Sequence, residues 1–305
     1  MSYIPSERDV RDVRSIVASL GFPTELVLAI LDFARYWPEI TNESIVHSVL
    51  LDEEWSLDFS VASIYLWAEL PQSDARYEDE NPKMREIEFT IVSHDQGWTT
   101  EDTKGSYQTS SWFEASIFRH ETPDYPSSYR AYEDNLWTNL EIARSFYAKH
   151  RGWHMVPRPS SHMEPQRLHC DEMKNITWSV EARQRQNEIY AEPSRNPQPR
   201  NAQASIQKTE TYNESDEGKH SWYLQGNEVA KGTSVFQGEM VKRYHVVWGC
   251  AANPTWKGDA GAGSGEAFVD SLQKGDIIVV WSRAKRRGWE NHVYGVRMTL
   301  RYTIN

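Results

Sequence analysis

Two stretches of the chain alternate apolar and polar residues with a period of two, and this pattern constrains the fold more than any other feature. In the first stretch, residues 85–119, strand-like runs at 86–93 and 111–119 flank a polar loop. The second stretch, residues 277–304, holds a strand, a loop around Trp289 and a long alternating strand. Period-two alternation is typical of strands that bury one face, so the sequence predicts a β-hairpin in each stretch.

Further strand-like runs place both hairpins in a larger antiparallel fold. Strands are expected at residues 60–69, 85–93, 110–119, 153–157, 221–229, 241–250, 276–284 and 292–304. Long loops, rather than regular helices, join most of these runs. The sequence therefore predicts a mainly β protein, an antiparallel jelly-roll-like β-sandwich, in which the first and the last hairpin pair with each other.

A short helical hairpin precedes these strands. Apolar residues recur at helical spacing over residues 8–19, and a second run after Pro23 places Leu26, Ile30 and Leu31 on one face. Two short helices are not stable alone. They are therefore expected to pack on the sandwich or to bind a partner protein through Leu26, Ile30 and Leu31.

Composition divides the chain further. We assign residues 1–55 to the helical hairpin and residues 56–305 to the sandwich. Residues 157–219 are rich in Pro, Gln, Asn, Arg, Ser and Glu, and their apolar residues are too sparse to offset the entropy lost on ordering. They are expected to form a long, largely irregular insertion in the sandwich.

Charge and hydropathy exclude several classes of function. The 305 residues include 33 Lys and Arg against 44 Asp and Glu, a net charge of -11, whereas nucleic-acid binding needs clustered cations. No run approaches the ~20 apolar residues that span a bilayer, and the charged N-terminus does not resemble a signal peptide. The two cysteines fit neither a disulfide framework nor a zinc site. We expect a soluble, cytoplasmic protein without a metal or cofactor.

Part of the helical hairpin resembles a known motif. The stretch FPTELVLAILDFARYWP is similar to the opening of an F-box, and the matching residues are Phe22, Pro23, Glu25, Leu26, Ile30 and Leu31. F-boxes couple substrate-binding domains to ubiquitin ligases. The resemblance therefore implies that the hairpin docks on an adaptor protein.

The two alternating stretches resemble the F-box-associated domain, a galactose-binding-like β-sandwich. The resemblance lies in HDQGW (residues 94–98), in SSWFEA (residues 110–115) and in YGVRMTLRY (residues 294–302). Uncharacterised fungal proteins with HDQGW and a C-terminal WSRAKRRGWENHV are similar too. The resemblance implies binding of glycans or of peptide segments through loops at one end of the sandwich.

The loops of both stretches carry residue types that such binding would use. The candidate ligand-binding residues are His94, Asp95, Gln96, Trp98, Trp112, Glu114, Arg283, Trp289, Asn291 and His292. In a sugar site an aromatic face stacks on the ring while carboxylates and amides bind the hydroxyls. The alternative is structural, with Trp98 and Trp112 in the core and Asp95 closing a turn. Arg283 and Asn291 are expected to make exposed polar contacts.

A catalytic function has less support in the sequence. Asp95 and Glu114 could serve as acid and base if they lie roughly 5 to 10 Å apart, but no nucleophile elbow and no HExxH-type metal site occurs. The sequence thus favours a non-enzymatic recognition protein for a glycan or a peptide. An enzyme that acts on a small molecule or a sugar through Asp95 and Glu114 is the alternative.

Overall fold

The structure is a computed structural model of the 305-residue chain. It describes residues 3–53, 60–71, 82–99, 103–122, 136–137, 139–159, 218–230, 240–285 and 288–304. Most of the insertion expected at residues 157–219 lies outside the described residues.

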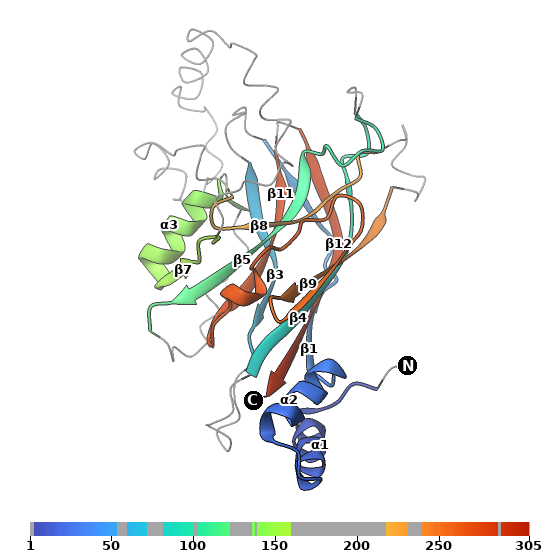
Figure 1. Cartoon of the computed structure of the whole chain (residues 1–305). Coiled ribbons are helices and arrows are strands. Elements are labelled where there is room, and N and C mark those ends of the chain that lie inside the picture. The colour runs from blue at the N-terminus through green and yellow to red at the C-terminus, as the bar shows by residue number, and fades with distance from the viewer. Residues whose placement is uncertain are drawn as a thin grey trace.

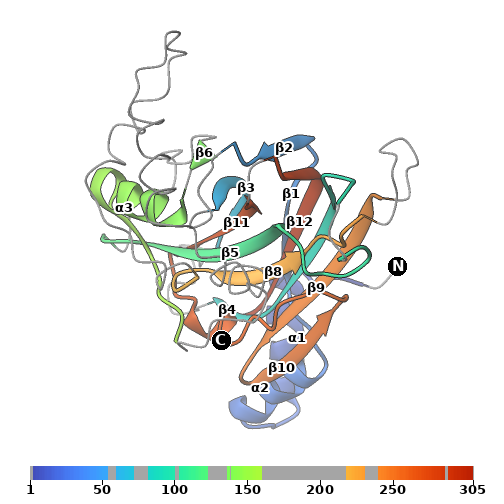
Figure 2. The same cartoon turned by 90° about the horizontal axis from the view of Figure 1, so that it is seen from above.

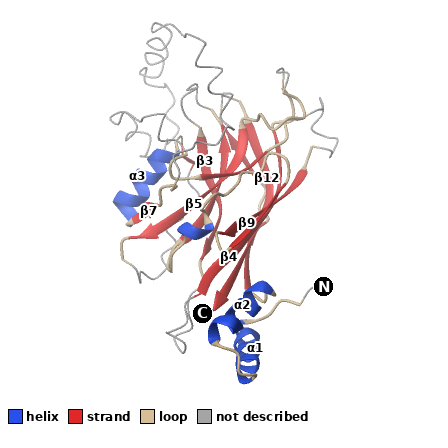
Figure 3. Ribbon diagram, viewed as in Figure 1, coloured by secondary structure: helices blue, strands red, loops and turns tan. Residues whose placement is uncertain are grey.

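The described strands form two antiparallel sheets (Figures 1 and 3). The first, which we call the β4 sheet, has the order β1-β12-β4-β9-β10, with β2 also paired to β12. Its strands are β1 (Glu39–Ser44), β2 (Ser48–Leu51), β4 (Pro82–Asp95), β9 (Lys242–Cys250), β10 (Asn253–Gly258) and β12 (Glu290–Ile304).

The second, which we call the β5 sheet, has the order β6-β3-β11-β5-β7, with β8 also paired to β5. Its strands are β3 (Val61–Glu69), β5 (Ser111–His120), β6 (Leu136–Trp137), β7 (Trp153–Met155), β8 (Trp222–Gly226) and β11 (Ile277–Ala284). A mainly β fold of antiparallel sheets, as the sequence predicts, is confirmed.

The two predicted hairpins are wrong, although the strands in them are right. β4 and β5 lie in different sheets, and so do β11 and β12. Each strand instead pairs with a strand of the other stretch, β4 with β12 and β5 with β11, which confirms the expected pairing of first with last. Alternation reveals that a strand has a buried face but does not identify its partner.

Apolar side chains from both sheets meet in one central core. β4 contributes Ile87, Phe89 and Ile91, and the facing β5 contributes Phe113 and Ile117; all five are fully buried. A short 3-10 helix, η6 (Val269–Ser271), packs at the edge of this core through Val269. The sheets therefore pack face to face as a sandwich.

The outer face of the β5 sheet is covered by helix α3 (Leu140–Arg151), which lies on the side away from β4 (Figure 2). The Asn139 side chain caps its first turn, and Gly152, in the left-handed conformation, ends it. Tyr147 packs on Phe118 and belongs with Trp281 to a second apolar cluster. β11 is consequently buried on both faces, which explains its continuous apolar run.

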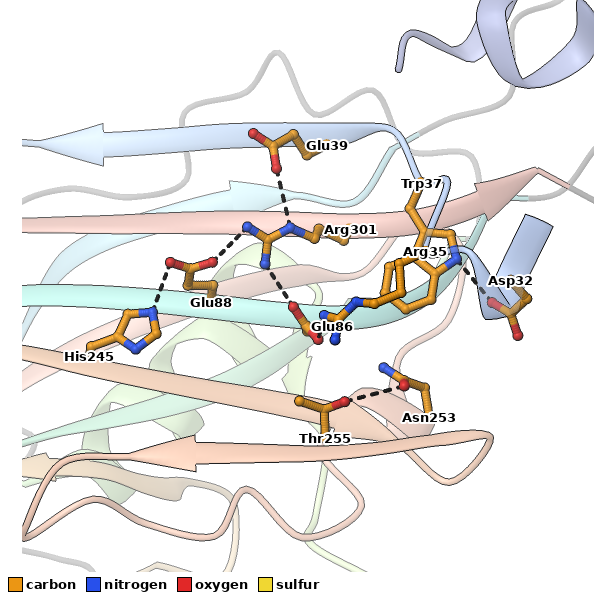
Figure 4. Close-up of polar contacts among 10 residues, drawn as sticks. All are labelled: Asp32, Arg35, Trp37, Glu39, Glu86, Glu88, His245, Asn253, Thr255 and Arg301. Atoms are coloured by element: carbon orange, nitrogen blue, oxygen red, sulfur yellow. Dashed lines mark hydrogen bonds and ion pairs between the residues drawn. The ribbon is translucent and has the colours of Figure 1, made fainter. Parts of the chain in front are cut away.

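The outer face of the β4 sheet carries a ladder of charges instead (Figure 4). Arg301 of β12 binds Glu86 at 2.7 Å and Glu88 at 2.6 Å on one side, and Glu39 at 3.2 Å on the other. His245 of β9 lies 2.8 Å from Glu88. Burial opposes ionisation of Glu88, but its bonds to Arg301 and His245 outweigh burial and lower its pKa.

Helices α1 (Glu7–Ser19) and α2 (Thr24–Phe33) pack at the end of the sandwich where the C-terminus lies (Figure 1). Val10, Val27 and Leu31 join the central core. Leu31 is therefore not available to a partner protein. The two helices lie within residues 7–33, whereas residues 39–51 hold two strands of the β4 sheet, so the helical unit expected over residues 1–55 is too long.

Helix α2 ends in a backbone conformation that is unusual for its residue. Arg35 has a φ of 53°, in the left-handed region that favours glycine. The amide of Tyr36 donates to the Leu31 carbonyl at 2.9 Å, which is the long bond of a Schellman motif. The Arg35 guanidinium binds Glu86 and lies 5.0 Å from the Trp37 ring, so these contacts offset the strain.

Replacing Arg35 with glycine or with alanine separates strain from contacts. Both variants lose the guanidinium, but only alanine keeps a Cβ in the left-handed conformation. We expect Arg35→Ala to be less stable than Arg35→Gly by about 1 kcal/mol, measured as the free energy of unfolding in urea. Equal stabilities would mean that the backbone at residue 35 is not strained.

Candidate functional site

Strand alternation separates the predicted site residues. Successive side chains of a strand point to opposite faces. On β4 the odd-numbered residues enter the central core, so Asp95 points inward and His94 outward. On β5 the odd-numbered residues also enter this core, so Trp112 and Glu114 lie on the outer face of the β5 sheet. The predicted residues therefore do not converge on one site.

Arg283 and Glu114 form a buried ion pair on the outer face of the β5 sheet. Their side chains are 0% and 2% exposed. The guanidinium of Arg283 donates to Glu114 and to the Ser60 hydroxyl. Glu114 also accepts hydrogen bonds from Trp112 Nε1 and from the Ser221 hydroxyl, both at 2.9 Å. The carboxylate thus has a polar partner on several sides.

The expectation that Arg283 makes an exposed polar contact is therefore wrong. A guanidinium can be fully buried only where a carboxylate and further acceptors satisfy it, and sequence alone does not reveal that Glu114 lies on the adjacent strand. Trp112 belongs to the same arrangement, because it is buried and its ring lies 5.4 Å from the Arg283 guanidinium.

A second polar network joins the two sheets at the end where β4 finishes and β12 begins, which we call the loop end. Asn291 of β12 donates to the carbonyls of Trp112 and Arg283 in the other sheet, at 3.0 and 3.1 Å. Asn227 donates to Asn291 at 3.0 Å and to the Ser111 hydroxyl at 2.9 Å. Asn291 is thus a buried bridge and not an exposed contact, because its amide satisfies backbone carbonyls between the sheets.

Asp95 is fully buried beside this network. Its carboxylate accepts hydrogen bonds from the backbone amides of Gly97 at 2.9 Å and Ala230 at 3.0 Å. Burial raises the pKa of Asp95, while the two amide bonds oppose that rise. The bond to Gly97 closes a turn, as in the structural alternative drawn from the sequence. With Glu114 also buried, the geometry does not favour these two carboxylates as an acid and base.

The outer face of the β4 sheet holds a cluster of rings near the loop end. His94 of β4 stacks on His292 of β12 with ring centroids 4.4 Å apart, and the two residues are direct cross-strand partners. His47 stacks on Tyr294 at 4.6 Å. We call these four residues the histidine cluster. Within this cluster His94 is buried, whereas His47 and Tyr294 are exposed.

Hydrogen bonds fix the state of the buried imidazole. His94 Nδ1 lies against the Asp95 carbonyl, which only accepts, so Nδ1 must carry the proton. His94 Nε2 then accepts from the Tyr294 hydroxyl at 3.1 Å. Burial lowers the pKa of His94, and the neighbouring His292 and His47 lower it further. Beside it, His292 Nε2 lies 2.6 Å from a carboxylate oxygen of Glu290.

The remaining predicted residues differ in their access to solvent. Trp98 is 57% exposed, so it does not fill the core. Gln96 is buried and its amide donates to the Trp98 carbonyl at 2.7 Å, which supports the backbone under the exposed ring. Trp289 is 9% exposed, and its carbonyl accepts the Asp52 amide at 3.0 Å.

Sequence reasoning missed three members of this region, His47, Glu290 and Tyr294. His47 follows β1, a short polar edge strand that gives no clear strand pattern. The alternation of residues 290–294, in contrast, was a usable signal, because it places Glu290, His292 and Tyr294 on one face of a strand.

No protein-family model, curated protein sequence or solved structure matches this chain. The resemblance to the F-box-associated domain therefore stays a prediction. Within the part of the chain that the structure describes, no set of three or more His, Cys, Asp or Glu side chains is arranged to hold a metal ion. The rings of the histidine cluster stack rather than converge. No helix in the described ranges is long and apolar enough to cross a membrane.

The Arg283 and Glu114 pair should couple strongly in unfolding experiments. Glu114→Gln leaves a buried guanidinium without its counter-charge, so we expect a loss of about 3 to 5 kcal/mol in the free energy of unfolding. The double variant Glu114→Gln with Arg283→Met removes both charges and should recover part of that loss. If the double variant loses the sum of the losses measured for Glu114→Gln alone and for Arg283→Met alone, the residues do not form a pair.

The histidine cluster should make stability depend on pH. The pKa of His94 is lowered in the folded protein, so between pH 8 and 6 the unfolded chain takes up a proton that the folded chain does not. The free energy of unfolding should therefore fall as the pH falls through this range. Denaturant titrations of wild type and His94→Gln should show a smaller fall in the variant; equal falls would contradict the buried neutral imidazole.

Proposed function

We propose that this chain is a non-enzymatic recognition protein that binds a glycan on the outer face of the β4 sheet at the loop end. One observation carries the proposal. Two exposed rings with polar tips, His47 and Tyr294, stack there, and the exposed Trp98 follows three residues after the end of β4. The carboxylates that could catalyse a reaction, Asp95 and Glu114, are buried in internal bonds.

The chemistry of this surface suits a sugar. A pyranose offers one apolar face and several hydroxyls, and it is bound by aromatic rings beside carboxylate and imidazole groups. Glu290 is 36% exposed and His292 17% exposed, so both can reach hydroxyl groups at the edge of the ring cluster. Trp98 lies four residues after His94, a span of at most roughly 14 Å, which one oligosaccharide can bridge.

The proposal includes the finer fold assignment. β4 pairs with β12 in one sheet, and β5 pairs with β11 in the facing sheet. Along the chain β4 is followed by β5, and β11 is followed by β12, so both connections cross from one sheet to the other. This double crossing supports a jelly-roll topology. Such a fold would agree with the resemblance to galactose-binding-like domains and with ligand binding by loops at one end.

Replacing Trp98 tests the ligand site. We expect the thermal midpoint of the wild-type protein to rise with the logarithm of the concentration of at least one sugar in a panel of mono- and oligosaccharides. Trp98→Ala should weaken binding of that sugar at least tenfold, equivalent to about 1.4 kcal/mol, in titration calorimetry.

Trp256→Ala is the matched control. Trp256 is 52% exposed, but it lies on β10 opposite Trp248, away from the loop end. The Trp256→Ala variant should bind the sugar as tightly as the wild type does. Absence of any sugar response in the wild type, or equal loss in both variants, would contradict the proposal. A response to peptides alone would assign the same surface to peptide recognition and likewise overturn glycan binding.

A further inference from the structure

The helical pair exposes an apolar surface. It consists of six side chains that are 44% to 93% exposed, and we call it the apolar helix surface: Ile16, Leu20, Phe22, Leu26, Ile30 and Phe33. Together they present roughly 700 Å² to solvent, more than the ~300 to 600 Å² of the largest apolar patch on a typical monomer. Such a patch marks an interaction site.

The surface arises because the apolar stripes of both helices are wider than their contact with the sandwich. On α1, Val10, Val13 and Val17 contact the central core, while Ile16 and Leu20 continue the same stripe to the free end of the helix. On α2, Val27 and Leu31 are buried, and Leu26, Ile30 and Phe33, spaced four and three residues apart, form an adjoining stripe. The uncovered stripes are therefore regular parts of the helices.

Charged residues are sparse in this region. Residues 16–33, which hold all six side chains, contain two charged residues, Glu25 and Asp32, whereas charged residues make up 25% of the chain. A contact between two copies through this surface therefore places few charged groups against each other.

We propose that the apolar helix surface binds the same surface of a second copy, which gives a symmetric dimer. The exposed area is close to the about 800 Å² per partner of a stable interface. The helices extend beyond the ends of the strands (Figures 1 and 3), so two copies can join tip to tip without contact between the sandwiches. Leu26 and Ile30 then contact another copy of this chain and not an adaptor protein.

Sedimentation velocity of the full chain, over about a thousandfold range of concentration, tests the dimer. The wild type should shift with concentration from the 35.4 kDa monomer to twice that mass. Leu20→Lys with Phe33→Lys should raise the dissociation constant at least a hundredfold, because two desolvated ammonium groups enter the interface from each copy. Both positions lie at helix C-termini, where a cation is compatible with the helix dipole.

Ile45→Lys with Val46→Lys is the matched control. These residues are 80% and 69% exposed between β1 and β2, and their variant should dimerise as the wild type does. A wild type that is monomeric throughout, or a Leu20→Lys and Phe33→Lys variant that still dimerises, overturns the proposal.

Hydrogen exchange of the wild type gives a reading that does not depend on any variant. At high protein concentration, amides within residues 16–33 should exchange several-fold more slowly than at low concentration, while those of β10 should not change. Concentration-dependent protection elsewhere, with none in residues 16–33, would place the dimer contact on another surface.

Discussion

The pairing of β4 with β12 determines where the rest of the molecule lies. It extends from Asn291 opposite Asp95 to Ile304 opposite Pro82, nearly the full length of both strands. One face of the pair enters the apolar core and the other carries charges and imidazoles. A slip of one residue would move the core residues of either strand to the solvent face. The core, the charge ladder and the histidine cluster therefore depend on one register.

The charge ladder connects this pair to the helices. Exposed ion pairs contribute little to stability, but the Glu86 side chain is 2% exposed and binds both Arg301 and Arg35. Removal of either cation would leave a buried carboxylate with less compensation. The contact with Glu86 offsets the strain of the left-handed backbone at Arg35. This backbone conformation sets the direction in which the chain leaves α2 and enters β1. The outer face of the sheet thus fixes the helical pair in place.

Local pattern predicts the strands but not their neighbours. The runs at 60–69, 241–250 and 276–284 are close to β3, β9 and β11, because each buries a face and shows it as periodicity. β1 and β10 escaped prediction because edge strands are polar and short. The site was predicted less well. His94 and Asp95 are adjacent in sequence, yet alternation sends them to opposite faces. Arg283 gives no sign in sequence of the carboxylate that lies beside it.

The buried polar groups at the loop end limit what that end can bind. Asp95, Asn291 and Glu114 are engaged within the protein, so a ligand can contact only the rings and side chains outside them. The glycan site that we propose there has few exposed groups, so a single site would bind weakly. A dimer joined through the helices would hold two loop ends at opposite extremes of one particle, because helices and loop end lie at opposite ends of the sandwich (Figure 1). Two sites that face away from each other cannot bind one surface together, so the proposed dimer would bridge two separate glycans and would not gain avidity on a single surface.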